Sequence, residues 1–256
     1  MLNDLYSEAA KICSPIAGKE IVSFVDVFGG SGQVLYNLPK EWNIQNKVYN
    51  DLDHNLYNTM CGLRNDEERE KIIKDFEILP SSREFFNSLK EKEKNNESLT
   101  PFEYLYATAN SFNSERKTFS TFISGKNEKY NRIINTALGA WNEIRTWTIE
   151  NLDFRKLLKM YDSEHTYFYL DPPYLTGGKH YKLNFSEQDF IDMFEILSKS
   201  KAYWLMNESE VDFDFIISIF GQPKYVKEYR NKFMSRAKIA NGTATSFRKE
   251  GYWTNY

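Results

Sequence analysis

Residues 21–32 read IVSFVDVFGGSG, an apolar run that ends in a glycine-rich loop. The run is short and rich in β-branched and aromatic side chains, which is typical of a buried strand. Because glycine has no Cβ, Gly29, Gly30 and Gly32 let a ligand approach the backbone closely. We therefore predict a strand over 21–27, a ligand-binding loop, and a helix that begins near residue 33.

The same alternation of apolar strands and amphipathic helices returns along the chain. Further strands are predicted at residues 47–51, 166–170, 201–207, 225–229 and 251–256. Helices are predicted at residues 3–13, from about 52 to 64, at 186–198, and up to residue 220. This pattern predicts an α/β fold with a Rossmann-like core, in which crossover helices cover the sheet.

The alternation is interrupted between residues 64 and 148. Residues 64–99 carry eight basic and ten acidic side chains and are predicted to form solvated helices. Thr100-Pro101-Phe102-Glu103 is a strong helix start, because threonine caps, proline suits the first turn and glutamate closes a capping box. A long amphipathic helix follows from Tyr130 to Trp147. We expect a core formed by residues 1–63 and 149–256, with a mostly helical insert at 64–148.

Composition describes an ordinary globular protein. Of its 256 residues, 41% are hydrophobic and 27% are charged, and no apolar run approaches the length of a membrane helix. Two cysteines are too few for a disulfide framework or a zinc site, so the cytoplasm is the expected compartment. The three histidines have no metal-ligand spacing, and we predict no metal. A net charge of −3 means that any contact with nucleic acid must come from local basic patches.

A carboxylate strengthens the prediction of a ligand at the glycine-rich loop. Asp51 closes the second predicted strand, 19 residues after Gly32. Nucleotide-binding α/β folds place an acid at this position to hold ribose hydroxyls. Asp53 is a second candidate, although a helix N-cap explains it equally well. The two features together predict an adenosine-containing cofactor.

The segment Asp171-Pro172-Pro173-Tyr174 follows directly after the apolar strand at 166–170. Two prolines stiffen the chain where it leaves the sheet. This rigid exit can aim the Asp171 carboxylate and a backbone carbonyl at one amino group, and Tyr174 can stack on a planar base. We therefore predict that these four residues bind and activate an exocyclic amine.

In these motifs the chain resembles the DNA adenine methylase (Dam-like) family of amino-methyltransferases. The likeness covers residues 20–256 and is most specific at 24–37, 48–58 and 171–175. It implies a methyltransferase core that uses S-adenosylmethionine to methylate adenine in double-stranded DNA, with residues 64–148 as the target-recognition module. For cofactor binding it implies Asp26, Phe28, Gly30, Ser31, Gly32, Asp51, Asp153, Phe154 and Asp171.

One family element is missing from the chain. Members of this family begin with an aromatic-x-Gly-Gly-Lys segment that contacts the cofactor, and the segment MLNDLYSEAAK does not match it. The residues Ala17-Gly18-Lys19 lie only five positions before Phe24, which is too close for this element. Tyr6, Lys11 and Lys19 remain alternative candidates for completing the cofactor pocket.

Two groups of basic residues are candidates for phosphate contacts. The first lies in the segment that resembles the family's DNA-contacting region, and comprises Arg116, Lys117, Lys126, Lys129 and Arg132. The second lies between residues 224 and 249, and we single out Lys232, Arg236 and Lys238. Both groups are also compatible with an ordinary solvated surface.

Two alternative functions stay open at this point. The same geometry could methylate another amine, in cytosine, in RNA or in a protein side chain. A catalytically silent, DNA-binding subunit with a cofactor fold would explain the missing N-terminal element. Whether a cognate restriction endonuclease acts on the same DNA site is also open.

Overall fold

The structure is a computed structural model that describes residues 19–111, 116–120, 126–175, 185–230 and 247–256. The predicted helix at 3–13 lies outside these residues. Within them, the strands form one seven-stranded sheet in the order β3-β2-β1-β4-β5-β7-β6. The bounds of the strands are β1 Ser23–Asp26, β2 Asn46–Asn50, β3 Thr148–Glu150, β4 Thr166–Leu170, β5 Tyr203–Ser209, β6 Tyr225–Arg230 and β7 Phe247–Thr254.

The sheet is parallel from β3 to β5, and β7 runs antiparallel to both β5 and β6. This arrangement confirms the predicted α/β class with a mainly parallel sheet. The order reverses between β1 and β4, since the chain proceeds outward through β2 on one side and through β5 on the other. In open α/β sheets, ligands bind at the carboxyl ends of the strands at such a switch point.

Most of the helices begin close to the residues at which the sequence predicted them to begin. Their bounds are α2 Gln33–Tyr36, α3 His54–Arg64, α4 Asp66–Ile78, α5 Arg83–Lys94, α6 Pro101–Ala109, α7 Lys126–Ile144, α8 Phe154–Tyr161, α9 Glu187–Leu197 and α10 Phe213–Phe220. Thr100 and Ser186 begin α6 and α9 with complete capping boxes, as the sequence signature requires. Of the helices that the structure describes, none has the length and apolarity needed to traverse a bilayer.

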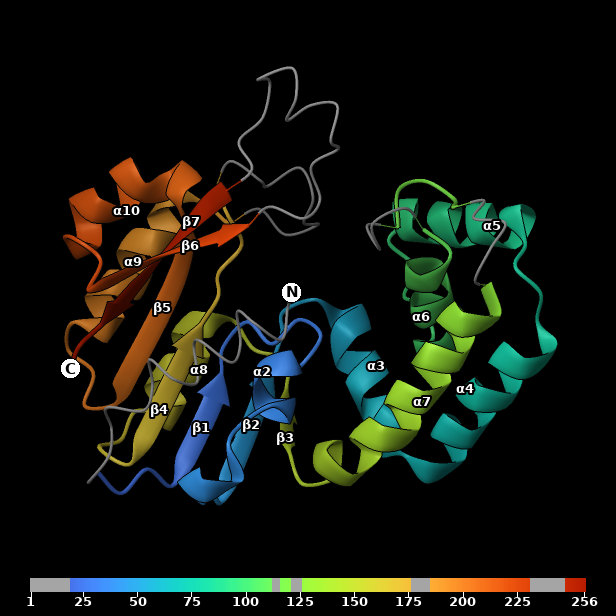
Figure 1. The fold of residues 1–256 in the computed structure, drawn as a ribbon, viewed down its shortest axis with the longest axis horizontal. Coiled ribbons are helices and arrows are strands. Elements are labelled where there is room, and N and C mark those ends of the chain that lie inside the picture. The colour runs from blue at the N-terminus through green and yellow to red at the C-terminus, as the bar shows by residue number, and fades with distance from the viewer. Residues whose placement is uncertain (1–18, 112–115, 121–125, 176–184, 231–246) are drawn as a thin grey trace.

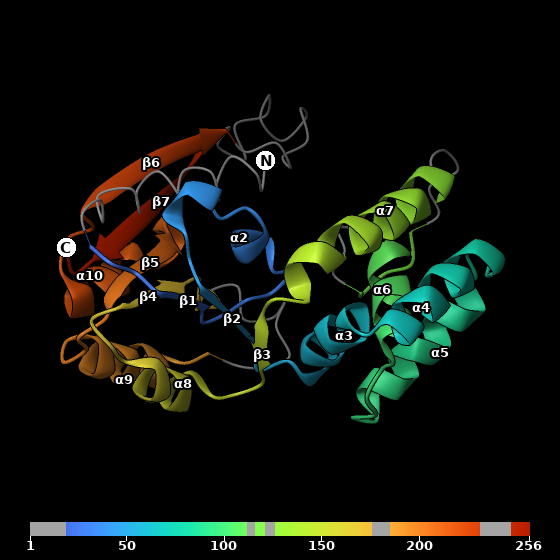
Figure 2. The same ribbon diagram turned by 90° about the horizontal axis from the view of Figure 1, so that it is seen from below.

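Alternating strand residues build two separate cores, one on each face of the sheet. Phe24, Tyr49 and Tyr167 pack with α2 on one face. Val25 and Phe168 pack with α8, α9 and α10 on the other face. Figure 2 shows this layering, with α8 and α9 on one side of the strands and α2 on the opposite side.

The helices α3 to α7 gather beside the β3 edge of the sheet (Figure 1). Helices α4 and α5 are highly charged, yet each buries apolar residues that join the first core, including Ile72 in α4 and Phe86 in α5. Helix α3 packs against α4, α6 and α7. Helix α3 therefore belongs by packing to this helical group. The sequence analysis instead assigned residues 54–63 to the core domain formed by 1–63 and 149–256. The division into that core domain and an insert at 64–148 stays a prediction.

Helix α7 differs from the prediction at both of its ends. It begins at Lys126 rather than at the predicted Tyr130, and it ends at Ile144 rather than at Trp147. Trp147 lies buried beyond the helix and stacks on Tyr49, with ring centroids 6.4 Å apart. Trp147 is therefore a core residue.

Gly29 is fixed by a close contact with the neighbouring strand. A Cβ at this position would lie 2.4 Å from Cε2 of Tyr49 and 3.0 Å from the carbonyl oxygen of Asn50.

We expect Gly29→Ala to lower the free energy of unfolding by about 1–3 kcal/mol, because the buried Tyr49 ring must shift. Chemical denaturation measures this change. Gly139→Ala in α7 is the control, since its Cβ would meet only the Tyr36 hydroxyl at 3.6 Å, and it should be neutral or stabilising. Equal stability of the two variants would contradict the expectation.

Candidate active site

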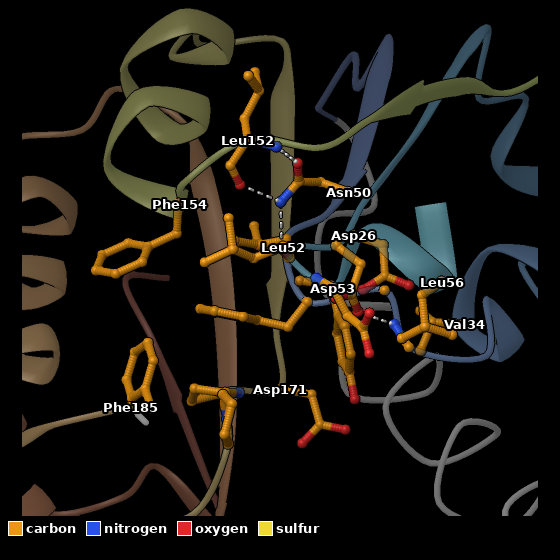
Figure 3. A pocket seen from close by; sticks show the side chains of 18 of the residues that line it. Asp26, Val34, Asn50, Leu52, Asp53, Leu56, Leu152, Phe154, Asp171 and Phe185 are labelled. Atoms are coloured by element: carbon orange, nitrogen blue, oxygen red, sulfur yellow. Dashed lines mark hydrogen bonds between the residues drawn. The ribbon is translucent and has the colours of Figure 1, made fainter. Parts of the chain in front are cut away.

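A cavity of about 320 Å³ opens at the carboxyl ends of β1, β2 and β4, next to the switch point in strand order. Its walls come from the glycine-rich loop, the ends of β2 and β4, the start of α8 and the residues before α9. Figure 3 shows Phe154 and Phe185 together on one side and Val34 and Leu56 on the opposite side. The cavity therefore joins segments that are far apart in the sequence.

The glycine-rich loop is fastened to the end of β2. The Gly30 N–H donates to Oδ2 of Asp51 at 2.9 Å, and the Asp53 N–H donates to Oδ1 at 2.8 Å. The Tyr49 hydroxyl donates to the Gly30 carbonyl at 2.8 Å. Burial raises the pKa of Asp51 to about 6, while the two backbone donors oppose this shift. Asp51 thus holds the loop as well as lining the cavity.

The predicted cofactor residues of this loop divide into two groups. Phe28, Gly30 and Ser31 line the cavity, whereas Gly32 does not. Gly32 begins α2 with φ at 72°, and a Cβ there would lie 3.1 Å from the Trp147 ring. The requirement for glycine at this position is therefore conformational and steric, rather than one of contact with a ligand.

Asn50 is a cavity residue that the sequence prediction missed. It is fully buried, and its amide nitrogen donates to the carbonyls of Val27 at 2.9 Å and Leu152 at 3.1 Å. Its side-chain oxygen accepts the Leu152 N–H at 2.9 Å (Figure 3). Asn50 therefore ties β1, β2 and the segment before α8 together at the cavity floor. An asparagine directly before Asp51 was the available signal.

Three phenylalanines form an aromatic wall. Phe28 and Phe154 have centroids 5.9 Å apart, and Phe185 meets Phe28 edge-on at 5.5 Å. The family resemblance implied Phe28 and Phe154 for cofactor contact, whereas Phe185 was not assigned there. Phe185 directly precedes Ser186, the N-cap of α9, and lies outside the two contiguous motifs, so its approach to the cavity depends on the fold.

Asp153 lines the cavity and is the N-cap of α8, where it accepts the Arg155 N–H. The Arg155 guanidinium pairs with Asp153 at 3.1 Å, with Asp192 at 2.7 Å and with Asp189. Asp189 also lines the cavity. Arg155 therefore joins the start of α8 to α9. It thereby holds Phe154, at the start of α8, close to Phe185, which directly precedes α9.

All four residues of the segment Asp171-Pro172-Pro173-Tyr174 line the cavity, and their catalytic role stays a prediction. Oδ1 of Asp171 accepts a hydrogen bond from Nδ2 of Asn207 at 3.0 Å. Burial raises the pKa of Asp171 to about 6, and the Asn207 hydrogen bond and the Arg248 cation oppose that rise. Asp171 therefore stays largely ionised at neutral pH and can accept a hydrogen bond.

Asp26 ends β1 beneath the same cavity and is 1% exposed. Both of its carboxylate oxygens are buried without a hydrogen-bond partner among the described residues. Burial raises the pKa of Asp26 well above its usual value, and the nearby Asp171 and Asp51 add to this effect. A buried carboxyl group without a donor is costly unless a ligand supplies one.

Carboxylates dominate the charge of the cavity. It is lined by Asp26, Asp51, Asp53, Asp153, Asp171 and Asp189. Among the described residues, no lysine, arginine or histidine lines it. This lining disfavours a phosphate-bearing nucleotide and favours a ligand that carries positive charge.

The predicted DNA-binding residues lie outside this cavity or outside the described residues. The Arg116 guanidinium donates to the Tyr104 hydroxyl at 2.9 Å and lies 3.5 Å from Glu93. It is thus engaged within the protein. Lys117 is described as a loop residue, while Lys126, Lys129 and Arg132 lie in α7 with side chains outside the description. Lys232, Arg236 and Lys238 fall wholly outside the described residues.

Lys19 does not complete the cavity in this structure. Its ammonium lies 5.9 Å from the centroid of the Tyr203 ring, at the start of β5 and so at the amino end of the sheet. Tyr6 and Lys11, the other two candidates, lie outside the described residues.

Comparison with known proteins yields one family match. The family model described as D12 class N6 adenine-specific DNA methyltransferase matches residues 6–244. This span includes the glycine-rich loop, Asp51, the helical group and Asp171-Pro172-Pro173-Tyr174. No curated protein matches the chain.

Proposed function

Because the chain belongs to the D12 class N6 adenine-specific DNA methyltransferase family, we propose that it transfers the methyl group of S-adenosylmethionine to the exocyclic amine of a flipped adenine. Its reaction class, methylation of adenine in DNA, follows from the family. The choice of methyl donor and the extrusion of the base are the parts that the site geometry supports.

The observation that carries the proposal is the acidic cavity with the Asp26 carboxyl group, which has no hydrogen-bond partner among the residues that the structure describes. S-adenosylmethionine supplies a methyl group activated on a positively charged sulfur, and it also carries an ammonium group. Asp26 and Asp171 stand at the carboxyl ends of adjacent strands β1 and β4, and their charges favour such a cation. The residues present therefore fit this cofactor better than a dinucleotide, whose phosphates they would repel.

The remaining lining residues fit the nucleoside part of the cofactor. The wall formed by Phe28, Phe154 and Phe185 offers aromatic surface for an adenine ring. Asp51 has spare acceptor capacity beyond its two backbone donors and would hold the ribose hydroxyls. Asp153 and Phe154 stand at the start of α8, beside this wall.

Asp171 would act on the substrate amine as a hydrogen-bond acceptor. The prolines fix the backbone of this segment, and the ionised carboxylate accepts one N–H of the amine and so directs the nitrogen lone pair away from itself. After transfer, the methylated nitrogen bears an extra proton, which the Asp171 carboxylate is suited to receive because its pKa is about 6. Tyr174 lines the same cavity and would stack on the base.

An adenine in a duplex cannot reach this cavity without leaving the stack. Extrusion of a base costs a few kcal/mol, and stacking on an aromatic side chain such as Tyr174 returns about 1–3 kcal/mol. The helical group α3–α7 stands beside the β3 edge of the sheet (Figure 1) and is our candidate for reading the target sequence. Lys117 and the lysines and arginine of α7 would contribute phosphate contacts.

Transfer of a labelled methyl group from S-adenosylmethionine tests the proposal. Unmethylated genomic DNA, RNA and a protein extract serve as acceptors, and the modified base is identified by mass spectrometry. We expect label in DNA as N6-methyladenine. Label in RNA or protein alone would overturn the proposed substrate. Cofactor binding without transfer to any acceptor would favour the silent, DNA-binding subunit.

The carboxylates of the cavity make cofactor binding depend on pH. Asp51 and Asp171 have pKa values raised to about 6 by burial, and a bound cation favours their ionised forms. Binding near pH 6 should therefore release protons, and each of these groups should weaken binding about tenfold between pH 7 and pH 5. Calorimetry in buffers of different ionisation enthalpy measures the released protons. Asp51→Asn should release fewer; equal heats in all buffers would contradict the expectation.

A further inference from the structure

Asn207 holds one oxygen of the Asp171 carboxylate from the neighbouring strand. Leu170 of β4 pairs with Met206 of β5, so the next residues, Asp171 and Asn207, stand side by side. Nδ2 of Asn207 donates to Oδ1 of Asp171 at 3.0 Å. The asparagine is 0% exposed and does not line the cavity. It therefore touches the catalytic carboxylate without reaching a ligand.

We propose that Asn207 is a positioning residue for methyl transfer, which orients the Asp171 carboxylate so that its other oxygen faces the substrate amine. This inference rests on the proposed function. The prolines fix the backbone of Asp171 but leave its side-chain torsions free. The Asn207 hydrogen bond removes that freedom, and reactions that depend on alignment are sensitive to displacements of about 1 Å.

The position of Asn207 is itself rigidly determined. It lies in β5 between β4 and β7, where it is paired with Tyr252. Both neighbouring strands are hydrogen-bonded to β5, which fixes the backbone of Asn207. Its side chain is fully buried, so packing restricts rotation of the amide as well. A donor on a central strand can thus define one orientation of the carboxylate.

Asn207 also offsets an unfavourable electrostatic environment. The charged and titratable groups that face Asp171 are Asp26 from β1, Glu208 from β5, Arg248, Glu250 and Tyr252 from β7, and Tyr174 from the same loop. Most of them are acidic, and burial raises the pKa of Glu208 to about 9 and of Glu250 to about 7. Hydrogen bonding from Asn207 lowers the pKa of Asp171 against burial, and Arg248 acts in the same direction.

The kinetic test compares Asn207→Leu and Asn207→Asp with a matched control. Asn255 also fastens β5, because it accepts the Trp204 N–H at 3.1 Å and donates to the Ala202 carbonyl at 2.9 Å, at the end of the strand far from Asp171. At pH 7 we expect Asn207→Leu to lower the single-turnover rate about 10–100-fold. At about pH 9, where the Asp171 carboxyl is largely ionised in both proteins, the Kd for S-adenosylmethionine should change less than about twofold. Asn255→Leu should leave the single-turnover rate within about twofold of the unmodified protein.

The pH profile separates positioning from a general structural loss. Loss of the amide donor removes a hydrogen bond that favours the ionised carboxylate, so the acidic limb of the rate profile should move upward by about one to two pH units in Asn207→Leu. Asn207→Asp preserves shape but adds an acidic neighbour, and its limb should move upward at least as far. A structural defect alone would lower the rate at every pH without moving this limb.

A second readout does not require catalysis. Carbon-13 NMR of aspartate-labelled protein follows the Asp171 carboxyl during titration, with Asp171→Asn to assign its signal. We expect a midpoint near 6 in the unmodified protein and a higher midpoint in Asn207→Leu. An unchanged midpoint, or a rate loss shared by Asn255→Leu with an unmoved pH limb, would overturn the role of Asn207. A higher NMR midpoint in Asn207→Leu, together with an unmodified protein that methylates no DNA, would instead overturn the proposed function.

Discussion

Replacement of Asp171 by asparagine is expected to lower the rate of methyl transfer by about 10²–10³-fold. The change keeps the size of the side chain but replaces the ionised acceptor with an amide, which cannot receive the proton of the methylated amine. Asp171 lies at the cavity, outside the two apolar cores, so folding should be preserved. Single-turnover transfer of labelled methyl to DNA measures the rate, and calorimetry measures retained cofactor binding.

Asp162→Asn is the matched control for this experiment. Its carboxylate accepts hydrogen bonds from Ser200, Lys201 and Ala202 near the opposite end of the sheet. The control should lose some stability but keep its rate per folded molecule. If Asp171→Asn retained most of its activity, Asp171 would not be the acceptor for the substrate amine.

Asp26→Asn is expected to move cofactor affinity and stability in opposite directions. Loss of a charged acceptor in the cavity should weaken binding of S-adenosylmethionine about 10–100-fold. The same change removes a buried carboxyl group that has no partner in the described part of the chain, and it should raise the free energy of unfolding of the cofactor-free protein by about 1–3 kcal/mol at pH 8. Calorimetry and chemical denaturation measure the two quantities.

The pH dependence supplies an internal check on Asp26→Asn. Because the pKa of Asp26 is raised in the folded protein, its unfavourable contribution is absent at low pH and develops as the pH rises toward the raised value. The gain in stability should therefore be smaller at pH 5 than at pH 8. Asp214→Asn, in the exposed part of α10, controls for the change in net charge. A loss of stability at both pH values would show that Asp26 is a structural residue.

Local sequence patterns determined the elements and their order. Four aromatic and apolar residues in succession, Tyr167–Leu170, form β4 together with Thr166 as predicted, because a parallel strand buried on both faces needs a continuous apolar run. The Thr100 and Ser186 signatures placed the starts of α6 and α9, since capping depends on residues within one turn. Where such signals were absent, as at the end of α7, the boundary was displaced.

The candidate site was predicted where its residues belong to contiguous motifs. Asp51 and the segment Asp171-Pro172-Pro173-Tyr174 line the cavity because each follows directly on a strand whose carboxyl end reaches the switch point. Gly32 belongs to the same motif but contacts Trp147 instead of the cavity. A motif thus identified the loop, whereas the direction of each residue within it depended on packing from another part of the chain.

Tertiary structure alone decided the relations between distant segments. The pairing of Asn207 with Asp171, the closure of the aromatic wall by Phe185 and the burial of Asp26 beneath the cavity all depend on which strands and helices become neighbours. Arg116 shows the same dependence, because its guanidinium lies against Glu93 and Tyr104 rather than in a purely solvated patch. The sequence by itself determined the strands, the helix starts and the two motifs, since these follow from interactions within a few residues. Burial and charge coupling act through space, so only the folded chain could assign them.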